Sequence, residues 1–399
     1  MLRHEMLDKI PVEFWTKIKK VFESCTGKGG FIVDIIDRFM IELKDSIPDE
    51  KERYKTIVEK CLYFSDINPT NIFICKLLID PYNEYKLNYN EGYTLELDIK
   101  EKWNIDDFDA VIGNPPYSTD PSKQDTIPLY NIFTEKYIDK CRYLLYVILS
   151  RWFISGKGLD GFRKKMKERK DIKLICHQDD EKKWFGNNVE IKGGVNYFLK
   201  DSEYNGNCLF NGNIYDLTKY DMIIKPKHHN IIDKIINYDS LKTLYKSSGY
   251  FKVRTNDKRL KDKGELKCYV SYLKSKNRYK FIDNYNNLNN SWKVITSRAA
   301  FGAYSGFGYK NISGPNEIYT DSYVSFHVKS YDEALSLLSY METKYVNYLL
   351  SVRKISQDIS ENTCKWIPIV PLNKKWNNDE VYKYFEITEE EIKIIEGSI

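Results

Sequence analysis

The sequence predicts an α/β domain with a largely parallel sheet, followed by a mixed α+β domain. From about residue 18 to 200, apolar runs of strand length alternate with longer amphipathic stretches, as expected of strands that are joined by helices. After about residue 205 the chain becomes rich in Lys, Asn, Tyr, Gly and Ser. A chain of 399 residues is long enough for two domains, which we place at 1–205 and 206–399.

Seven apolar runs are the expected strands of the first domain. They cover residues 18–23, 62–65, 93–97, 110–113, 143–149, 172–176 and 194–199. In residues 31–40 the apolar side chains cover a wide face, as in a helix that packs on a sheet. Near the end of the chain, Thr388 and Glu391 have the spacing of a capping box, which predicts a short terminal helix.

The composition argues against several classes of protein. No window approaches the roughly 18 apolar residues of a membrane-spanning helix, and the first residues lack the apolar run of a secretory signal. The eight cysteines are scattered, without a CxxC pair or a closely spaced Cys/His set, so we expect neither a disulfide framework nor a bound metal. We therefore expect a cytoplasmic protein without a membrane partner.

A glycine-rich turn follows the first expected strand, in the segment Phe22-Glu23-Ser24-Cys25-Thr26-Gly27-Lys28-Gly29-Gly30-Phe31. Glycines let the backbone approach a ligand closely, and Glu23 at the strand end can accept hydrogen bonds from a positively charged amino acid moiety. The cofactor-binding candidates of this turn are Glu23, Thr26, Gly27 and Gly29. The turn has no GK[ST] triplet and is therefore not a phosphate-binding loop of that type, and a purely structural turn remains open.

An acidic residue, Asp66, directly follows the second expected strand, and Ile67 comes next. In a Rossmann-like sheet this position hydrogen-bonds the ribose hydroxyls of a cofactor, so Asp66 is a candidate ribose ligand and Ile67 a further cofactor contact. The alternative is that Asp66 or Asn68 caps a helix without any cofactor.

The segment Ile112-Gly113-Asn114-Pro115-Pro116-Tyr117 is the most specific signal in the chain. Two successive prolines exclude both a helix and regular strand pairing, so the chain must leave its strand as a stiff loop at the carboxyl edge of the sheet, where ligands bind in open α/β folds. The tetrapeptide after an apolar strand resembles the catalytic NPPY motif of amino-methyltransferases. This resemblance implies S-adenosyl-L-methionine as cofactor, and Asn114, Pro115, Pro116 and Tyr117 as the catalytic residues.

The chemistry of an amino group explains these residue types. The lone pair of an adenine amino nitrogen is delocalised into the ring, which makes the nitrogen a poor nucleophile. If the Asn114 side-chain oxygen and the Pro115 carbonyl accept hydrogen bonds from its two N–H groups, the lone pair is directed toward the methyl group. Tyr117 would stack on the base. A rigid turn without a catalytic role is the alternative.

The order of the motifs narrows the resemblance. The chain has, in order, a glycine turn, an acidic ribose site, Asp98 as an adenine-contacting acid, NPPY, and then a long irregular segment. This order is similar to that of gamma-class adenine-specific DNA methyltransferases of restriction-modification systems. Further matching segments lie at 129–133, 149–153, 158–163 and 189–198. The resemblance covers roughly residues 1–200 and implies a Rossmann-like methyltransferase domain there.

The family also uses an aromatic ring that packs the flipped adenine from its other face. The last matching segment makes Phe198 the first candidate for this ring and Tyr197 the second, and because they alternate across a strand at most one can serve. The chain departs from the family in having Glu23 where Asp is usual and Lys28 where a small residue is common. The family's Thr-Pro segment, which precedes the stretch matching residues 6–11, has no counterpart here, so we expect either a substitute or weaker cofactor binding.

Cations gather in the second half of the chain. Between residues 252 and 280, eleven basic residues stand against three acidic ones, with aromatic residues interleaved. Clustered cations neutralise phosphates, so we expect the second domain to be the target-recognition domain and to bind double-stranded DNA. The DNA-binding candidates are Lys252, Arg254, Lys258, Arg259 and Arg298. A solvated charged surface is the alternative.

These motifs together predict a site-specific DNA adenine methyltransferase, with a cognate restriction endonuclease as a further partner. Two other classes remain open. One is a non-catalytic DNA-binding subunit with a decayed cofactor site. The other is an RNA or protein-glutamine methyltransferase that shares the NPPY motif, although such enzymes usually lack a large domain after the catalytic one.

Overall fold

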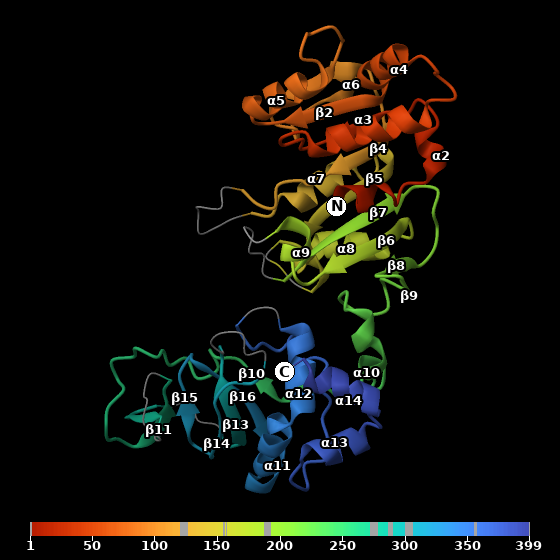
Figure 1. Ribbon diagram of the computed structural model, residues 1–399. Helices are drawn as coiled ribbons and strands as arrows, with labels where there is room; N and C mark the ends of the chain where they lie inside the picture. The colour runs from red at the N-terminus through yellow and green to blue at the C-terminus, as the bar shows by residue number, and fades with distance from the viewer. Residues whose placement is uncertain are drawn as a thin grey trace. The chain divides into compact units, whose positions relative to one another are not determined.

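The computed structural model describes residues 2–119, 127–154, 156, 158–186, 193–271, 278–285, 290–299, 306–354 and 357–398. The chain divides into two compact units, Met1–Pro226 and Lys227–Ile399 (Figure 1). The boundary therefore lies later than the one we place at 205/206. The physical reason is that strands β8 (Cys208–Phe210) and β9 (Asn213–Tyr215) continue the sheet of the first unit.

A nine-stranded sheet of order β3-β2-β1-β4-β5-β7-β6-β8-β9 forms the centre of the first unit. Its first seven strands along the chain are β1 (Val21–Glu23), β2 (Leu62–Asp66), β3 (Asn88–Glu91), β4 (Phe108–Gly113), β5 (Cys141–Leu149), β6 (Ile172–Gln178) and β7 (Val195–Asp201). Strands β1 to β5 pair in parallel, and β7 runs antiparallel between β5 and β6. The expected Rossmann-like α/β fold is confirmed.

Helices cover both faces of this sheet. On one face lie α1 (Leu2–Leu7), α2 (Val12–Trp15), α3 (Gly30–Glu42), α4 (Glu50–Thr56), the π-helical turn at Ile57–Cys61 and α5 (Pro69–Ile79), which share a core with the sheet. Helices α6 (Ile99–Trp103) and α7 (Tyr130–Tyr137) lie on the other face, where Trp103 and Tyr137 pack on Phe22. The chain then adds a 3-10 turn at Ser150–Phe153, α8 (Asp160–Glu168) and α9 (Lys182–Phe185).

The third strand is the one expected element that is wrong. Residues 93–97 form turns, in which the Glu96 and Leu97 N–H groups donate to the carbonyls of Tyr93 and Thr94, and the strand is β3 instead. Strand β3 lies at the edge of the sheet and its sequence, Asn-Tyr-Asn-Glu, is mostly polar. Because an edge strand is only half covered, it carries little of the apolar signal on which strand prediction depends.

The second unit is α+β, as expected. It holds a four-stranded sheet of order β10-β16-β13-β14 and a three-stranded sheet of order β12-β11-β15. The strands are β10 (Tyr245–Lys246), β11 (Leu266–Tyr269), β12 (Tyr279–Ile282), β13 (Trp292–Ser297), β14 (Lys310–Ser313), β15 (Ile318–Tyr319) and β16 (Tyr323–Val328). The helices are α10 (His229–Asp233), α11 (Tyr331–Glu342), α12 (Lys344–Arg353), α13 (Asn378–Tyr384) and α14 (Glu389–Glu396), with 3-10 turns at Pro226–His228 and Leu241–Leu244. The capping box of Thr388 and Glu391 at α14 is confirmed.

A buried lysine lies inside the four-stranded sheet of this unit. Lys293 on β13 is fully buried, and its ammonium donates to the carbonyls of Ser291 at 2.9 Å and Gly314 at 2.7 Å. Burial lowers the pKa of Lys293 from its usual range near 10 to about 8. Between these values the unfolded chain binds more protons than the folded protein, so the stability that this group contributes rises with pH.

We predict that Lys293→Met removes this rise. Relative to the variant, the wild-type protein should gain about 1–3 kcal/mol of unfolding free energy between pH 8 and 10. Urea unfolding followed by circular dichroism measures the difference. Buried tyrosines and cysteines titrate in both proteins and cancel in the comparison. A wild-type-to-variant difference that stays constant over this range would contradict the prediction.

Candidate active site

A cavity of about 580 Å³ lies at the carboxyl end of β1 in the first unit, within the range of about 300–1,000 Å³ that is typical of small-molecule sites. Glu23, Thr26 and Gly27 of the glycine turn line it, and so does Asn114 of the NPPY segment. Residues more than 85 positions apart in the sequence are thus brought into one site because β1 and β4 are parallel neighbours. Helices α1, α3 and α9, Cys25 and strand β5 supply the remaining walls.

Internal hydrogen bonds fix the shape of the glycine turn. The Thr26 hydroxyl donates to Glu23 Oε2 at 3.0 Å, and the Gly27 N–H donates to Asp66 Oδ2 at 2.8 Å. Gly29 has a φ of +81°, and a Cβ there would lie only 3.1 Å from the Cys75 sulfur. Gly29 therefore shapes the turn from behind, where only glycine fits, and the other three candidates line the cavity.

Glu23 is a buried acid that faces a ligand-sized cavity. Its side chain is 2% exposed, and burial raises the pKa of its carboxyl well above the usual range. The hydrogen bond from Thr26 and the charge of Arg3 act in the opposite direction, while the nearby carboxylate of Asp66 raises the pKa further. A cation in the cavity would favour the ionised form of Glu23, so the site is suited to a positively charged group.

The other acidic candidates lie outside the cavity lining. Asp66 ends β2, and its carboxylate accepts N–H bonds from Gly27 and Asn68, which leaves lone pairs for a further donor. Ile67 is 65% exposed beside it. Asp98 is exposed and caps α6 by accepting N–H bonds from Lys100 and Glu101, which accounts for this residue without a cofactor.

The NPPY segment leaves β4 directly after Gly113. The Asn114 side chain is exposed to the cavity, Pro115 is buried and Pro116 is exposed. The loop closes on itself, because Ser118 pairs with Pro128 and the Leu129 N–H donates to the Tyr117 carbonyl at 3.3 Å. The Tyr117 hydroxyl is buried and has no hydrogen-bond partner that meets the distance and angle criteria in the described part of the chain. Burial raises the pKa of Tyr117, and the nearby Asn114 amide lowers it to a smaller extent.

Neither aromatic candidate for the second face of the base reaches the cavity. Phe198 and Tyr197 are both fully buried in β7, and the Tyr197 hydroxyl donates to Glu5 at 2.6 Å. The rings that do line the cavity are Trp184 and Phe185 on α9. Sequence reasoning missed them, although two adjacent aromatic residues in the otherwise polar run Glu-Lys-Lys-Trp-Phe-Gly-Asn-Asn were a usable signal.

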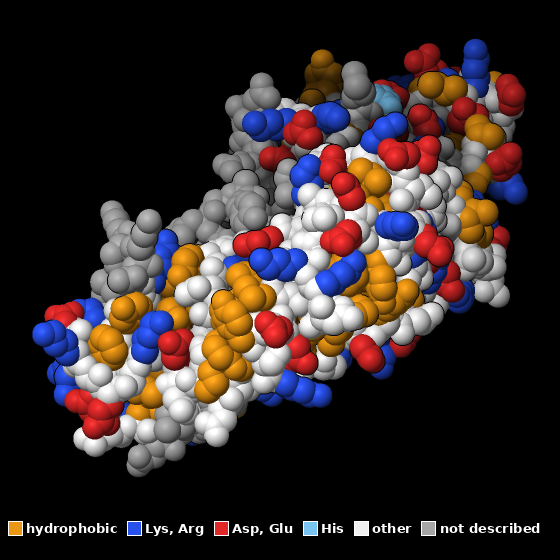
Figure 2. Space-filling view, turned by 90° about the horizontal axis from the view of Figure 1, so that it is seen from below, with side chains coloured by type: hydrophobic (Ala, Val, Ile, Leu, Met, Phe, Trp, Pro, Cys, Tyr) orange, Lys and Arg blue, Asp and Glu red, His pale blue; other side chains and the backbone are white. Residues whose placement is uncertain are grey.

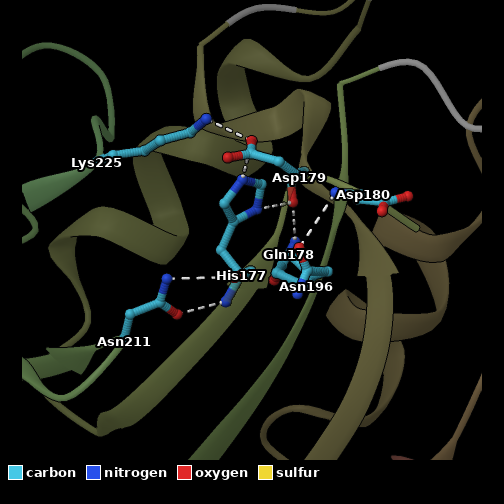
Figure 3. A network of polar contacts seen from close by, with 8 residues as sticks. His177, Gln178, Asp179, Asp180, Asn196, Asn211 and Lys225 are labelled. Carbon is cyan, nitrogen blue, oxygen red and sulfur yellow. Dashed lines mark hydrogen bonds and ion pairs between the residues drawn. The ribbon is translucent and has the colours of Figure 1, made fainter. Parts of the chain in front are cut away.

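A polar network holds the turn from which α9 starts (Figure 3). The His177 ring bonds the Ser150 hydroxyl at 2.8 Å on one side and the Asp179 carboxylate at 3.0 Å on the other, and Lys225 pairs with the same carboxylate. The His177 ring and the Lys225 ammonium hold the pKa of Asp179 well below its usual range. Asn211 accepts from the His177 backbone N–H at 2.7 Å. The network therefore fixes the end of β6 and, with it, the start of the segment that carries Trp184 and Phe185.

The cations of the second unit fall into two groups. Many are paired with carboxylates, including the candidates Arg259, with Asp257, and Arg298, with Asp358. The candidates Lys252, Arg254 and Lys258 are exposed and form no ion pair with a described residue. Figure 2 shows basic and acidic side chains intermingled on the face that it presents. Lys274, Lys276 and the middle of the segment 297–309 lie outside the described residues.

Two features are absent from the residues that the structure describes. No helix there is long and apolar enough to cross a membrane. No group of three or more His, Cys, Asp or Glu side chains in the same part of the chain is arranged to hold a metal ion.

Residues 60–185 match the model of the Eco57I restriction-modification methylase family. An uncharacterized adenine-specific methylase of Mycoplasma pneumoniae is 28% identical over 212 residues, which cover 51% of this chain and 50% of that protein. The chain thus spans about half the length of this curated relative. The resemblance to adenine-specific methyltransferases of restriction-modification systems is confirmed.

Two solved structures that this chain resembles are proteins of restriction-modification systems. A modification subunit of a putative type I restriction enzyme from Vibrio vulnificus YJ016 is 13% identical, with coverage of 62% of this chain and 55% of that chain and a TM-score of 0.39. The type ISP restriction-modification enzyme LlaGI is 14% identical, with coverage of 88% and 44% and a TM-score of 0.49. The assignment of individual site residues rests on the geometry of this chain.

Proposed function

We propose that this protein transfers a methyl group from S-adenosylmethionine to the exocyclic amino group of adenine in double-stranded DNA. The observation that carries the proposal is the single cavity shared by Asn114 of the NPPY segment and by Glu23, Thr26 and Gly27 of the glycine turn. A cofactor site and an amino-group site must adjoin for direct transfer, because the reacting atoms have to approach within about 3–3.5 Å. The match to a restriction-modification methylase family supports the same reaction.

The residues around the cavity fit the cofactor. Glu23 suits a positively charged amino group, and the glycine turn lets the backbone come close. We propose that the cofactor's adenosine part runs past Gly27 toward Asp66 and the exposed Ile67. The free lone pairs of the Asp66 carboxylate would accept hydrogen bonds from the ribose hydroxyls. Asp98 is the weakest of the cofactor candidates because its carboxylate already caps α6. When bound, the cofactor would supply an electrophilic methyl group.

The chain's own groups would activate and hold the adenine. The Asn114 amide oxygen and the Pro115 carbonyl would accept hydrogen bonds from the two N–H groups of the adenine amino group, while Pro116 keeps the loop extended. Tyr117 would stack on one face of the extruded base, and Phe185 is our candidate for the other. Phe185 is preferred to Trp184 because Trp184 already packs on Tyr197 at a ring distance of 5.4 Å, whereas Phe185 makes no ring contact with a described aromatic residue.

The proposal is tested by methyl transfer to three substrates in parallel. Labelled S-adenosylmethionine is offered with unmethylated genomic DNA, ribosomal RNA or protein, and the digested nucleosides or amino acids are separated. We expect N6-methyladenine in DNA alone. Label in RNA or in glutamine would replace the proposed substrate, and a folded protein that neither transfers methyl groups nor binds S-adenosylhomocysteine would support the non-catalytic subunit instead.

We further propose that the second unit recognises the DNA target and that a restriction endonuclease acts in the same system. Lys252, Arg254 and Lys258 form no ion pair with a described residue, so binding a phosphate would not require breaking one of the described ion pairs. We predict that replacing all three by alanine lowers the slope of log Kd against log salt concentration by about 2–3, since each phosphate contact contributes about 0.9.

A matched triple variant provides the control. Arg259, Lys261 and Lys280 lie in the same segment and are each paired with an aspartate, namely Asp257, Asp283 and Asp262. Replacing these three removes the same formal charge, but we expect a change in slope below about 1 because their charge is already compensated. Fluorescence anisotropy with a duplex at several salt concentrations measures both variants, and equal slopes for the two would refute the assignment of the unpaired group.

A further inference from the structure

Helix α1 brings an arginine into the wall of the cavity. Arg3 lines the same cavity as Glu23 and Asn114, and its guanidinium lies over Gly30, the first residue of α3. A Cβ at Gly30 would lie 3.0 Å from Arg3 Cζ and Nη1, so glycine is what leaves room for this side chain. The guanidinium is therefore accommodated against the glycine turn at the cavity edge, and it does not extend freely into solvent.

The hydrogen bonds of Arg3 leave its outer nitrogens available. Nε donates to Asp34 Oδ2 at 2.5 Å, and neither terminal nitrogen bonds a described residue. The Asp34 side chain is 7% exposed, whereas that of Arg3 is 46% exposed. Asp34 thus orients the guanidinium from the buried side, and the two terminal NH2 groups remain for an anion. Arginine can bind a carboxylate through these groups with two parallel hydrogen bonds.

Side chains of opposite charge line this cavity. Glu23 is the acid suited to a cation, and Arg3 is close enough for its charge to act on the Glu23 carboxyl. A ligand with both an ammonium and a carboxylate on one carbon would satisfy both residues. An α-amino acid group has this pattern, and S-adenosylmethionine ends in one.

We infer that Arg3 binds the carboxylate of the cofactor's amino acid moiety, while Glu23 binds its ammonium. The inference rests on the proposed function, because it takes S-adenosylmethionine as the ligand. It assigns to α1 a direct part in cofactor binding, which the glycine turn alone does not provide: that turn offers backbone N–H groups and acids, but no cationic side chain oriented by a buried acid.

The test is a comparison of two ligands by calorimetry. S-adenosylhomocysteine carries the carboxylate, and S-adenosyl-3-thiopropylamine is the same molecule without it. We expect the wild-type protein to prefer the first ligand by about 10- to 100-fold, the range of a charge-assisted, bidentate hydrogen bond. Arg3→Ala should reduce this preference to less than about 3-fold by weakening only the binding of S-adenosylhomocysteine, and Arg3→Lys should keep part of it.

A matched control separates ligand binding from helix docking. Arg38 on α3 pairs with Asp8, which lies just beyond the end of α1, and so links the same two helical regions as Arg3 and Asp34 do. Arg38 does not line the cavity. Arg38→Ala should therefore leave the preference unchanged. Lys183 on α9 is a second cation that lines the cavity. If Arg3→Ala weakens both ligands equally, or if Lys183→Ala abolishes the preference instead, the assignment is overturned while the proposed function stands. If the folded wild-type protein binds neither ligand, the proposed function fails as well.

Discussion

Replacing Asn114 by alanine should lower the rate of DNA methylation by at least about 10²–10³-fold, the loss seen when a hydrogen-bonding group that acts in the transition state is removed. The Asn114 side chain is exposed at the cavity, so its truncation leaves no void in the core. The variant should therefore keep the wild-type unfolding curve. Its affinity for S-adenosylhomocysteine should change by less than about 3-fold, because the amide acts on the substrate amino group.

Tyr117→Phe is the matched control for this loop. It removes a buried hydroxyl that has no hydrogen-bond partner among the described residues and keeps the ring that would stack on the base. Removing an unsatisfied buried polar group costs nothing in lost bonds, so activity should stay within about 3-fold of wild type and stability should hold or rise. Single-turnover methyl transfer measures both variants. If Asn114→Ala retained wild-type rates, the amide would have no catalytic role.

The parts of the fold that could be predicted are those whose physical signal is local. Strands β4 and β5 are apolar on both faces because helices cover both sides of the sheet, and they stand out in the sequence for that reason. The capping box of Thr388 and Glu391 predicts the start of helix α14. Strand β3 has neither feature, since it is an edge strand with polar side chains, and its position depends on pairing with β2.

The candidate site could be predicted where backbone chemistry dictates it. Glycines in a strand-to-helix turn and two prolines after a strand constrain the chain itself, so Glu23, Thr26, Gly27 and Asn114 were identifiable before any geometry was known. Contributions from side chains alone were not. Arg3 reaches the cavity because α1 packs on α3, and this packing has no signature in the residues next to Arg3.

The cation group shows the same limit for electrostatics. The sequence gathers eleven basic residues between 252 and 280, but it does not reveal which of them are neutralised. Asp257 lies two residues from Arg259 and pairs with it, whereas Asp283 follows β12 and pairs with Lys261, which precedes β11. Only after pairing is known does a subset remain for phosphates, and that subset is what binding experiments should address.

Phe185→Ala should lower kcat/KM for DNA methylation by about 10- to 100-fold and lower stability only slightly, because Phe185 is only partly buried against the core of the first unit. The loss corresponds to one base–aromatic stacking contact, about 1–3 kcal/mol. Phe185 is half-buried at the cavity, and its helix is held by its own N–H bonds and by the network around His177 and Asp179. Phe185→Trp should restore much of the activity, because a larger ring can stack in the same place.

The contrast with Phe198 decides which ring serves the base. Phe198 is fully buried in β7, so Phe198→Ala should cost about 3–5 kcal/mol of unfolding free energy, and the milder Phe198→Leu should lower stability while leaving kcat/KM nearly unchanged. Thermal unfolding and steady-state kinetics on the same samples separate the two effects. Suppose instead that Phe198→Leu lost activity at unchanged stability and that Phe185→Ala retained activity. The base would then stack on Phe198 of β7, and α9 would only close the cavity.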